Sequence, residues 1–137
     1  MRIATWNVNS LKARMDRVME WLDRGQPDVL LMQETKLADD AFAELLAGPL
    51  AERGYEVAAH GEPSWNGVAI LSRVGLDDVE TGLGDVPGET RPEARAVSAT
   101  CAGIRVTSVY VPNGLSPGSP HYAYKLAWLA ALGELVA

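Results

Sequence analysis

The first 53 residues alternate between segments with the hydrophobic pattern of a strand and segments with that of a helix. Residues 2–8 are rich in β-forming residues and predict a strand. Ser10 is a favourable helix N-cap, and a helix is predicted from there to Gly25 and Pro27. Residues 29–32 are continuously apolar, which is typical of a strand buried on both faces. A strand, a helix and a strand in this order predict a parallel, right-handed crossover. The apolar positions of the helix recur at helical spacing, at Leu11, Met15, Val18, Met19 and Leu22.

Two further helices are predicted. The first is expected over residues 40–53, where Gly48-Pro49 can bend or break it. The second is expected from about residue 122, after a loop over residues 112–120. Helical spacing gives the inward positions of the first helix and one apolar face of the second. These positions are Phe42, Leu45, Leu46 and Leu50 in the first, and Leu126, Leu129, Leu132 and Val136 in the second.

Between these two helices the sequence changes to short strand candidates, which are separated by turns containing glycine or proline. Residues 82–92 are polar and contain glycines, so a loop is expected there. Strands and helices in this arrangement predict an α/β fold. The strand candidates are residues 55–60, 67–72, 77–81, 95–100 and 104–111.

The composition is that of an ordinary globular protein. Apolar residues make up 47% and charged residues 22% of the 137 residues, which disfavours a disordered chain or a membrane protein. The N-terminus lacks the charged and apolar regions of a secretion signal. Cys101 is the single cysteine, so neither an intramolecular disulfide nor a cysteine-rich zinc site is expected, and Cys101 itself is expected to be a buried filler. A cytoplasmic protein without membrane contacts fits these features.

The net charge of −6 argues against a protein that coats nucleic acid through a broad basic surface. An enzyme that binds a few phosphates in one groove needs only local cations and a bound metal. The charge therefore leaves nucleic acid open as a substrate.

Two polar side chains follow the strands of the predicted crossover. Asn7 stands at the end of the first strand, and Glu34 comes just after the second. Parallel strands end at the same edge of a sheet, where open α/β folds usually bind ligands, so these side chains should lie close together. A carboxylate beside an amide suits a hard cation such as Mg²⁺. On position alone, it is equally well supported that Glu34 caps a loop and Asn7 serves a turn.

Several segments, in order along the whole chain, resemble one known family. They are Trp6-Asn7-Val8-Asn9-Ser10-Leu11, Leu31-Met32-Gln33-Glu34-Thr35-Lys36, Trp65-Asn66-Gly67-Val68-Ala69-Ile70-Leu71-Ser72, Glu93-Ala94-Arg95, Tyr110-Val111-Pro112-Asn113-Gly114 and Tyr122-Ala123-Tyr124-Lys125-Leu126. Together they resemble the exonuclease III family of AP endonucleases, within the endonuclease/exonuclease/phosphatase superfamily. Ala94 departs mildly from the family pattern, which usually has glycine there.

The resemblance implies catalytic and metal-binding roles for three residues. Glu34 would bind the catalytic Mg²⁺, which polarises the scissile phosphate. Asn7 would belong to the metal site and help to orient the attacking water. Tyr110 would stabilise the phosphate in the transition state.

The resemblance also implies contacts with DNA or phosphate. Asn113 would hold DNA from its loop, and Asn9 and Lys36 would contact the backbone phosphates or support the metal site. Arg95 is a further candidate for phosphate binding. Because Arg95 lies in a strand-like segment, an ion pair is an equally good explanation for it.

For the fold, the resemblance implies the N-terminal portion of a four-layer αββα sandwich of the DNase I type, with a mixed sheet flanked by helices. Residues 1–137 would then be one partial endonuclease/exonuclease/phosphatase domain without its C-terminal half. Members of the family carry further catalytic residues beyond the segments matched here. The chain alone is therefore expected to lack part of the active site, and to aggregate, dimerise or remain partly molten.

The implied function is that of a magnesium-dependent DNA repair phosphodiesterase, an AP endonuclease or 3′-to-5′ exodeoxyribonuclease III. Its expected partner is duplex DNA with abasic sites or 3′ ends, its cofactor is Mg²⁺ with Mn²⁺ as an alternative, and the complete protein is expected to be a monomer. Two other hypotheses stay open. One is another phosphodiesterase or phosphatase of the superfamily, and the other is an inactive truncated fragment or binding module.

Overall fold

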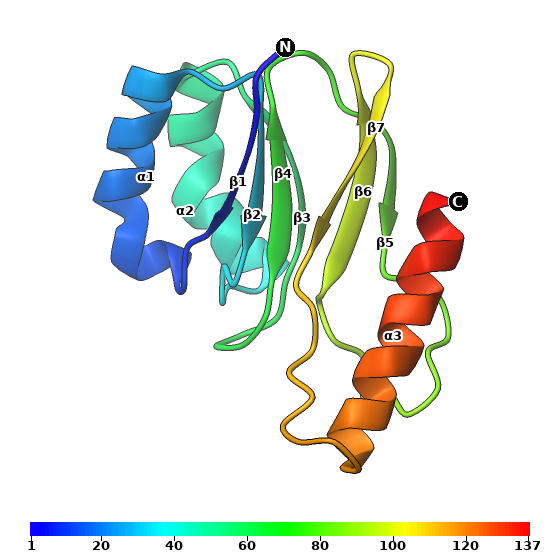
Figure 1. Ribbon diagram of the computed structural model, residues 1–137. Coiled ribbons are helices and arrows are strands. Elements are labelled where there is room, and N and C mark those ends of the chain that lie inside the picture. Colours follow the sequence, from blue (N-terminus) through cyan, green and yellow to red (C-terminus); the bar gives the residue numbers. More distant parts are fainter. The chain divides into compact units, whose positions relative to one another are not determined.

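The computed structural model describes residues 1–137, which divide into two compact units (Figure 1). The larger unit comprises residues 1–81 and 94–110, and the smaller unit comprises residues 82–93 and 111–137. All strands and the first two helices belong to the larger unit, and the last helix belongs to the smaller one.

The first sheet of the larger unit has four strands in the order β1-β2-β4-β3. They are β1 (Ile3–Asn7), β2 (Val29–Gln33), β4 (Val68–Ser72) and β3 (Glu56–His60). The parallel pairing of β1 with β2 confirms the predicted crossover, whereas β4 runs antiparallel to both of its neighbours. The sheet is therefore mixed, as expected. Strand β4 is buried at every residue because it lies in the interior of this sheet and a second sheet packs on it.

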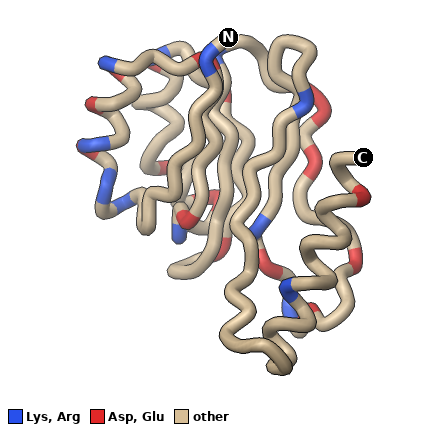
Figure 2. Tube along the Cα trace, in the orientation of Figure 1, with Lys and Arg blue, Asp and Glu red and all other residues tan.

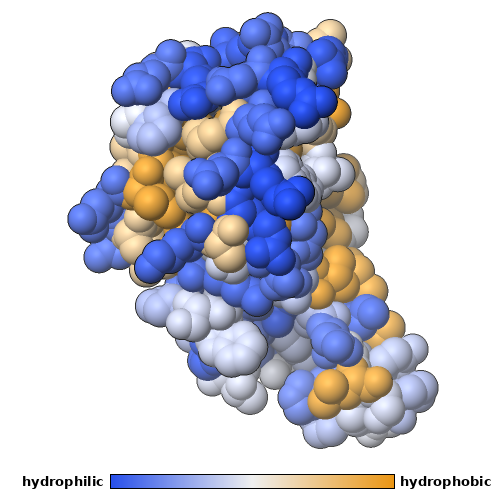
Figure 3. Space-filling model, turned by 90° about the vertical axis from the view of Figure 1, so that its left-hand side faces the viewer, coloured by the Kyte–Doolittle hydropathy of each residue, from blue (hydrophilic) through white to orange (hydrophobic).

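Helix α1 (Leu11–Gly25) connects β1 to β2. Ser10 caps it, since its Oγ accepts a hydrogen bond from Ala13 N at 3.3 Å. Both basic and acidic residues occur along α1 (Figure 2), and the face of the molecule that carries α1 is mainly hydrophilic (Figure 3). Its inner surface is apolar, with Leu11, Val18 and Leu22 buried. This amphipathic pattern explains both the helix and the side it turns to the sheet.

Helix α2 (Asp39–Glu52) connects β2 to β3. Its observed ends lie one residue before those predicted, and the helix continues through Pro49 to Glu52. The inward positions Phe42, Leu46 and Leu50 are buried as predicted. Burial of this apolar face stabilises the helix against the disruption that proline causes.

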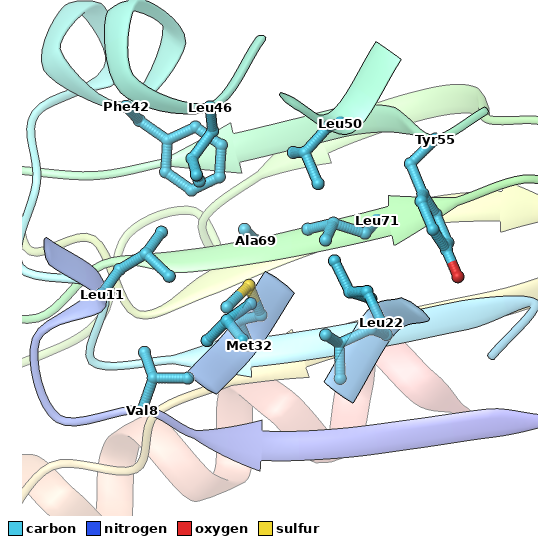
Figure 4. Packing of buried hydrophobic residues seen from close by; sticks show 12 residues of the cluster. Val8, Leu11, Leu22, Met32, Phe42, Leu46, Leu50, Tyr55, Ala69 and Leu71 are labelled. Atoms are coloured by element: carbon cyan, nitrogen blue, oxygen red, sulfur yellow. The ribbon is translucent and has the colours of Figure 1, made fainter. Parts of the chain in front are cut away.

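The first hydrophobic core lies between α1, α2 and the sheet. Figure 4 shows Phe42, Leu46 and Leu50 of α2 above Ala69 and Leu71 of β4, with Met32 of β2 alongside. Tyr55 closes one end of this core, and its hydroxyl donates a hydrogen bond to Pro27 O at 2.6 Å. The buried phenol is thus satisfied, as a buried polar group must be.

The second sheet has the antiparallel order β5-β6-β7. Its strands are β5 (Asp77–Thr81), β6 (Ala96–Cys101) and β7 (Ile104–Val109). A second core joins it to the first sheet and includes Val29, Ile70, Val97 and Cys101. Cys101 is buried and free, as the sequence predicts. The larger unit is therefore an α/β structure with helices, a mixed sheet and a second sheet in successive layers.

In the smaller unit, helix α3 (Pro120–Val136) begins two residues earlier than expected, because Ser119 caps it and accepts a hydrogen bond from Tyr122 N at 3.1 Å. The buried residues of α3 are Tyr124 and Trp128. The predicted apolar face is not the buried one, since Leu126 and Leu129 are exposed. Two aromatic residues at positions i and i+4 provide more apolar area than the leucines and decide which side is covered. None of the helices combines the length and hydropathy that a membrane span requires.

Candidate active site

The site begins where β1 and β2 end side by side. Asn7 and Gln33 are register partners in the parallel pair, so Glu34 follows directly at the edge of the sheet. Asn7 Nδ2 donates a hydrogen bond to Glu34 Oε1 at 3.2 Å. The predicted proximity of these two side chains is therefore confirmed. The contact follows from the crossover, because both strands deliver their last side chains to the same edge.

The backbone at Glu34 takes an unusual conformation. Glu34 and Lys36 have φ angles of 56° and 57°, in the left-handed region that side chains other than glycine rarely adopt. Surrounding hydrogen bonds hold the segment in place from two sides. They run from Ser10 N to Glu34 O, from Leu11 N to Thr35 O, from Thr35 N to Gly67 O and from Lys36 N to Asn66 O. Strain of this kind persists only where the neighbouring structure over-determines it, and it is concentrated at functional sites.

Lys36 and Asn9 complete a polar ring around Glu34. Lys36 Nζ lies 3.7 Å from Glu34 Oε2 and donates to Asn9 Oδ1 at 2.8 Å. Asn9 N in turn donates to Asn7 Oδ1 at 3.1 Å. The carboxylate is thus flanked by an amide on one side and an ammonium group on the other. Both neighbours limit its rotation, and the Lys36 ammonium group balances its charge.

Tyr110 approaches the same carboxylate from the end of β7, and Arg95 lies against it. The Arg95 guanidinium carbon is 5.1 Å from the centroid of the Tyr110 ring, within cation–π distance. Tyr110 N donates to Arg95 O at 2.8 Å, and Arg95 Nη1 donates to Tyr110 O at 3.1 Å. The structure thus shows Arg95 in contact with Tyr110, which is neither of the two roles left open for it, and phosphate binding by Arg95 stays a prediction.

The local electrostatics determine the charge states of Glu34 and Tyr110. Burial raises the pKa of the Glu34 carboxyl, but hydrogen bonds from Tyr110 and Asn7 and the charge of Lys36 outweigh it, so this pKa lies below its ordinary value. Burial raises the pKa of Tyr110, and the hydrogen bond and charge of Glu34 raise it further. At neutral pH the site therefore presents an ionised carboxylate acceptor beside a protonated phenol donor.

The remaining predicted residue, Asn113, belongs to the smaller unit. Its Oδ1 accepts a hydrogen bond from Leu115 N at 2.8 Å, which is a local turn contact. The structure brings together Asn7, Asn9, Glu34, Lys36, Arg95 and Tyr110 within the larger unit. For Asn113 the DNA contact stays a prediction.

Glu62 is a further polar residue near the site, and it was not predicted from the sequence. Its Oε2 accepts hydrogen bonds from Asn66 Nδ2 at 3.1 Å and from Ala94 N at 2.8 Å. It thereby fixes the loop whose backbone holds Lys36. No local pattern marks Glu62, because its partner at residue 94 is 32 positions away.

Comparison with known proteins identifies the family. Residues 4–137 match the family described as Endonuclease/Exonuclease/phosphatase family. The chain belongs to this family. The chain is 30% identical over 130 residues to the DNA repair nuclease APEX1 of Danio rerio, covering 93% of this chain and 41% of the relative. It is also 37% identical over 73 residues to exodeoxyribonuclease III of Haemophilus influenzae, covering 53% of this chain and 26% of the relative.

Solved structures agree with this assignment. The chain is similar to the 3′ phosphatase NExo of Neisseria bound to a product DNA hairpin, with a TM-score of 0.88 and 42% identity, covering 99% of this chain and 51% of that one. It is also similar to an AP endonuclease from Archaeoglobus fulgidus, with a TM-score of 0.85 and 40% identity. This match covers 98% of this chain and 50% of that one. The chain thus spans about half the length of these structures. These likenesses confirm the predicted fold class.

The donor set of this family member suits a hard divalent cation. Glu34 offers two carboxylate oxygens, and no group of three or more histidine, cysteine, aspartate and glutamate side chains gathers anywhere in the structure. Mg²⁺ is commonly bound by one or two carboxylates together with waters and substrate phosphates, so a single carboxylate fits it. Asn7 Oδ1 is already bonded to Asn9 N, and Asn7 Nδ2 faces Glu34. This geometry favours Asn7 as the support of the carboxylate.

Proposed function

We propose that this chain is the metal-binding portion of a DNA repair phosphodiesterase of the exonuclease III and AP endonuclease type. The observation that carries the proposal is the ionised Glu34 carboxylate, held between Asn7 and Lys36 and facing Tyr110. Support for DNA as the substrate comes from the similar structure that is bound to a DNA hairpin and from relatives named as DNA repair nucleases. Abasic sites and 3′ ends in duplex DNA are the proposed points of attack.

In this proposal Glu34 binds Mg²⁺, for which Mn²⁺ can substitute. When bound, the cation polarises the phosphodiester and offsets negative charge on its oxygens. Asn7 orients the Glu34 carboxylate through its Nδ2 hydrogen bond. The chemistry of the cation requires hard oxygen ligands, which Glu34 provides.

The other residues act on the phosphate. Tyr110 is protonated at neutral pH and donates its hydroxyl to a phosphate oxygen as negative charge develops there. Arg95 fixes the position of Tyr110 through its stacked guanidinium and its bond to Tyr110 O. Lys36 provides a positive charge for the DNA backbone, and Lys36 and Asn9 both provide hydrogen bonds to it. Asn113 provides a further contact with DNA.

We further propose that residues 1–137 form part of a longer catalytic domain, because the chain spans only about half of the structures that it matches. The activity of the complete enzyme then depends on residues outside the chain. The complete protein is proposed to be a cytoplasmic monomer. The free, buried Cys101 fits a reducing compartment.

The experiment compares two quantities for the chain and its Glu34→Gln variant. The first is the affinity for Mg²⁺ and Mn²⁺ by calorimetry, and the second is incision of duplexes with an abasic site or a recessed 3′ end. Glu34→Gln should remove metal binding together with any metal-dependent incision. Glu20→Gln is the matched control, because Glu20 pairs with Arg24 on the exposed surface of α1.

Metal binding without incision supports the metal site and the dependence on a longer domain. Hydrolysis of a phospholipid headgroup or a phosphate monoester in preference to DNA would favour another enzyme of the superfamily. Wild-type affinity for Mg²⁺ in Glu34→Gln would contradict the proposal.

A further inference from the structure

A second polar layer lies one step behind the candidate active site. Thr5 stands two residues before Asn7 in β1, Gln33 directly precedes Glu34 in β2, and Ser108 stands two residues before Tyr110 at the end of β7. Side chains two residues apart on a strand point to the same face. Each member of this layer therefore lies within two residues of one residue of the site along the chain.

The carboxamide of Gln33 joins the three strands. Its Nε2 donates to Thr5 Oγ1 at 2.9 Å and to Ser108 Oγ at 3.2 Å, and lies 3.3 Å from Leu31 O. Ser108 Oγ, buried in the interior, then donates to Met32 O at 2.8 Å. Because the serine hydrogen is used toward Met32, its oxygen is free to accept, and the direction of each bond is consistent. One amide thus connects β2 to its neighbour β1 and to β7 of the opposite sheet.

This connection differs in kind from the contacts around it. The core between the two sheets consists of apolar side chains such as Val29, Ile70 and Val97. Burial of apolar surface holds the sheets together without prescribing a direction. Hydrogen bonds have a preferred distance and angle, so they fix the register of one strand against another. The Gln33 amide supplies such bonds at the end of the sheets where the site lies.

We propose that Gln33 is a positioning residue, which holds Glu34, Asn7 and Tyr110 in one arrangement by tying β2 to Thr5 and Ser108. This inference rests on the proposed function, in which Glu34 binds a divalent cation. Partners that orient a metal-binding carboxylate typically change metal affinity about 10- to 100-fold when they are removed. If the role of Gln33 were purely structural, its replacement would change only the stability of the fold and not the metal affinity.

The test removes the tie in three ways. Gln33→Met keeps the approximate length of the side chain and removes all of its hydrogen bonds. Thr5→Val and Ser108→Ala each remove one arm, and Thr5→Ser and Ser108→Thr restore the hydroxyl as rescue variants. Ser98→Ala is the matched control, because Ser98 is a buried serine of neighbouring β6 whose hydroxyl is bonded to Thr107 Oγ1 at 2.9 Å.

Two readouts separate positioning from stability. The first is the calorimetric affinity for Mg²⁺ alone, which should fall about 10- to 100-fold in Gln33→Met and less in each single-arm variant. The second is the NMR signal of the Asn7 side-chain amide in the metal-free chain. In Gln33→Met that signal should move toward its position in Glu34→Ala, where Asn7 has lost this partner. Ser98→Ala should lower the melting temperature and leave both readouts unchanged.

If Gln33→Met does not fold, the single-arm variants and their rescue partners decide the question. Unchanged Mg²⁺ affinity together with an unchanged Asn7 signal, in variants that melt at lower temperature, would overturn the inference. A wild-type chain that binds no Mg²⁺ would refute the proposed function. The Asn7 signal would then still decide whether Gln33 positions the site.

Discussion

Asn7 and Glu34 are 27 residues apart in the chain, yet Asn7 Nδ2 donates a hydrogen bond to Glu34 Oε1 at 3.2 Å. The parallel pairing of β1 and β2 causes this contact, because it brings both strand ends to one edge of the sheet. The carboxylate is therefore oriented before any ligand arrives. Orientation of this kind lowers the cost of binding a cation, since fewer rotamers are lost.

Replacing Asn7 should weaken metal binding without unfolding the chain. Asn7→Ala removes the donor to Glu34, and the affinity for Mg²⁺ should fall about 10- to 100-fold. Calorimetry measures the affinity, and circular dichroism checks the fold. Asn113→Ala makes the same chemical change in the smaller unit and should leave Mg²⁺ affinity at the wild-type value. Equal effects of the two substitutions would argue against a supporting role for Asn7.

The stability that Glu34 contributes should depend on pH in one direction. Its pKa in the folded chain lies below the ordinary value of 4.5, so the unfolded chain takes up the proton first as the solution is acidified. The contribution is present in full above the unfolded pKa and is lost as pH falls through the folded pKa. Urea denaturation from neutral pH to about pH 3.5 should therefore show the wild type losing stability relative to Glu34→Gln. If the difference in stability between the wild type and Glu34→Gln stayed constant over this pH range, the lowered pKa of Glu34 would be contradicted.

Removing the Tyr110 hydroxyl should change the titration of its neighbour. The hydrogen bond from Tyr110 lowers the pKa of Glu34, so Tyr110→Phe should raise this pKa toward its ordinary value. Carbon NMR of the Glu34 carboxyl measures the change directly. Tyr122→Phe, in the smaller unit, is the matched control and should leave the titration unaltered. Failure of Tyr110→Phe to move it would mean that the hydroxyl does not interact with the carboxylate.

Gly67 should be indispensable for the shape of the Glu34 loop. It has a φ of +94°, and a Cβ there would lie 2.1 Å from Thr35 Oγ1. Gly75 has a φ of +100° but open space around it, so Gly75→Ala isolates the backbone cost of roughly 1–2 kcal/mol. Gly67→Ala should lose clearly more stability in urea denaturation and should also weaken Mg²⁺ binding. Equal losses of stability in the two variants would show that the Thr35 side chain can move away from the added Cβ without a cost in stability.

The sequence was sufficient for the local elements and for the contact between Asn7 and Glu34. Helix α1 and strands β1 and β2 follow from hydrophobic spacing and from Ser10, and the crossover topology then brings the two side chains together. Arg95 had two possible roles, because a strand position does not reveal what lies across from it. The Gln33 tie was not predicted, since Ser108 is 75 residues away and the register between two sheets is not written in any local pattern. The prediction of the buried face of α3 was wrong for a related reason. Helical spacing alone placed the leucines on the buried face, whereas Tyr124 and Trp128 are the buried residues.

The left-handed backbone at Glu34 and Lys36 has a consequence for how the protein can change over generations. A glycine at either position would adopt the same conformation without the cost of a Cβ, which is about 1–2 kcal/mol per residue. Backbone conformation taken alone would therefore favour glycine over the carboxylate and the ammonium group at these positions. The presence of charged side chains at this backbone cost fits the role in chemistry proposed for the site. At these two positions the backbone conformation favours glycine, whereas the proposed chemistry requires charged side chains.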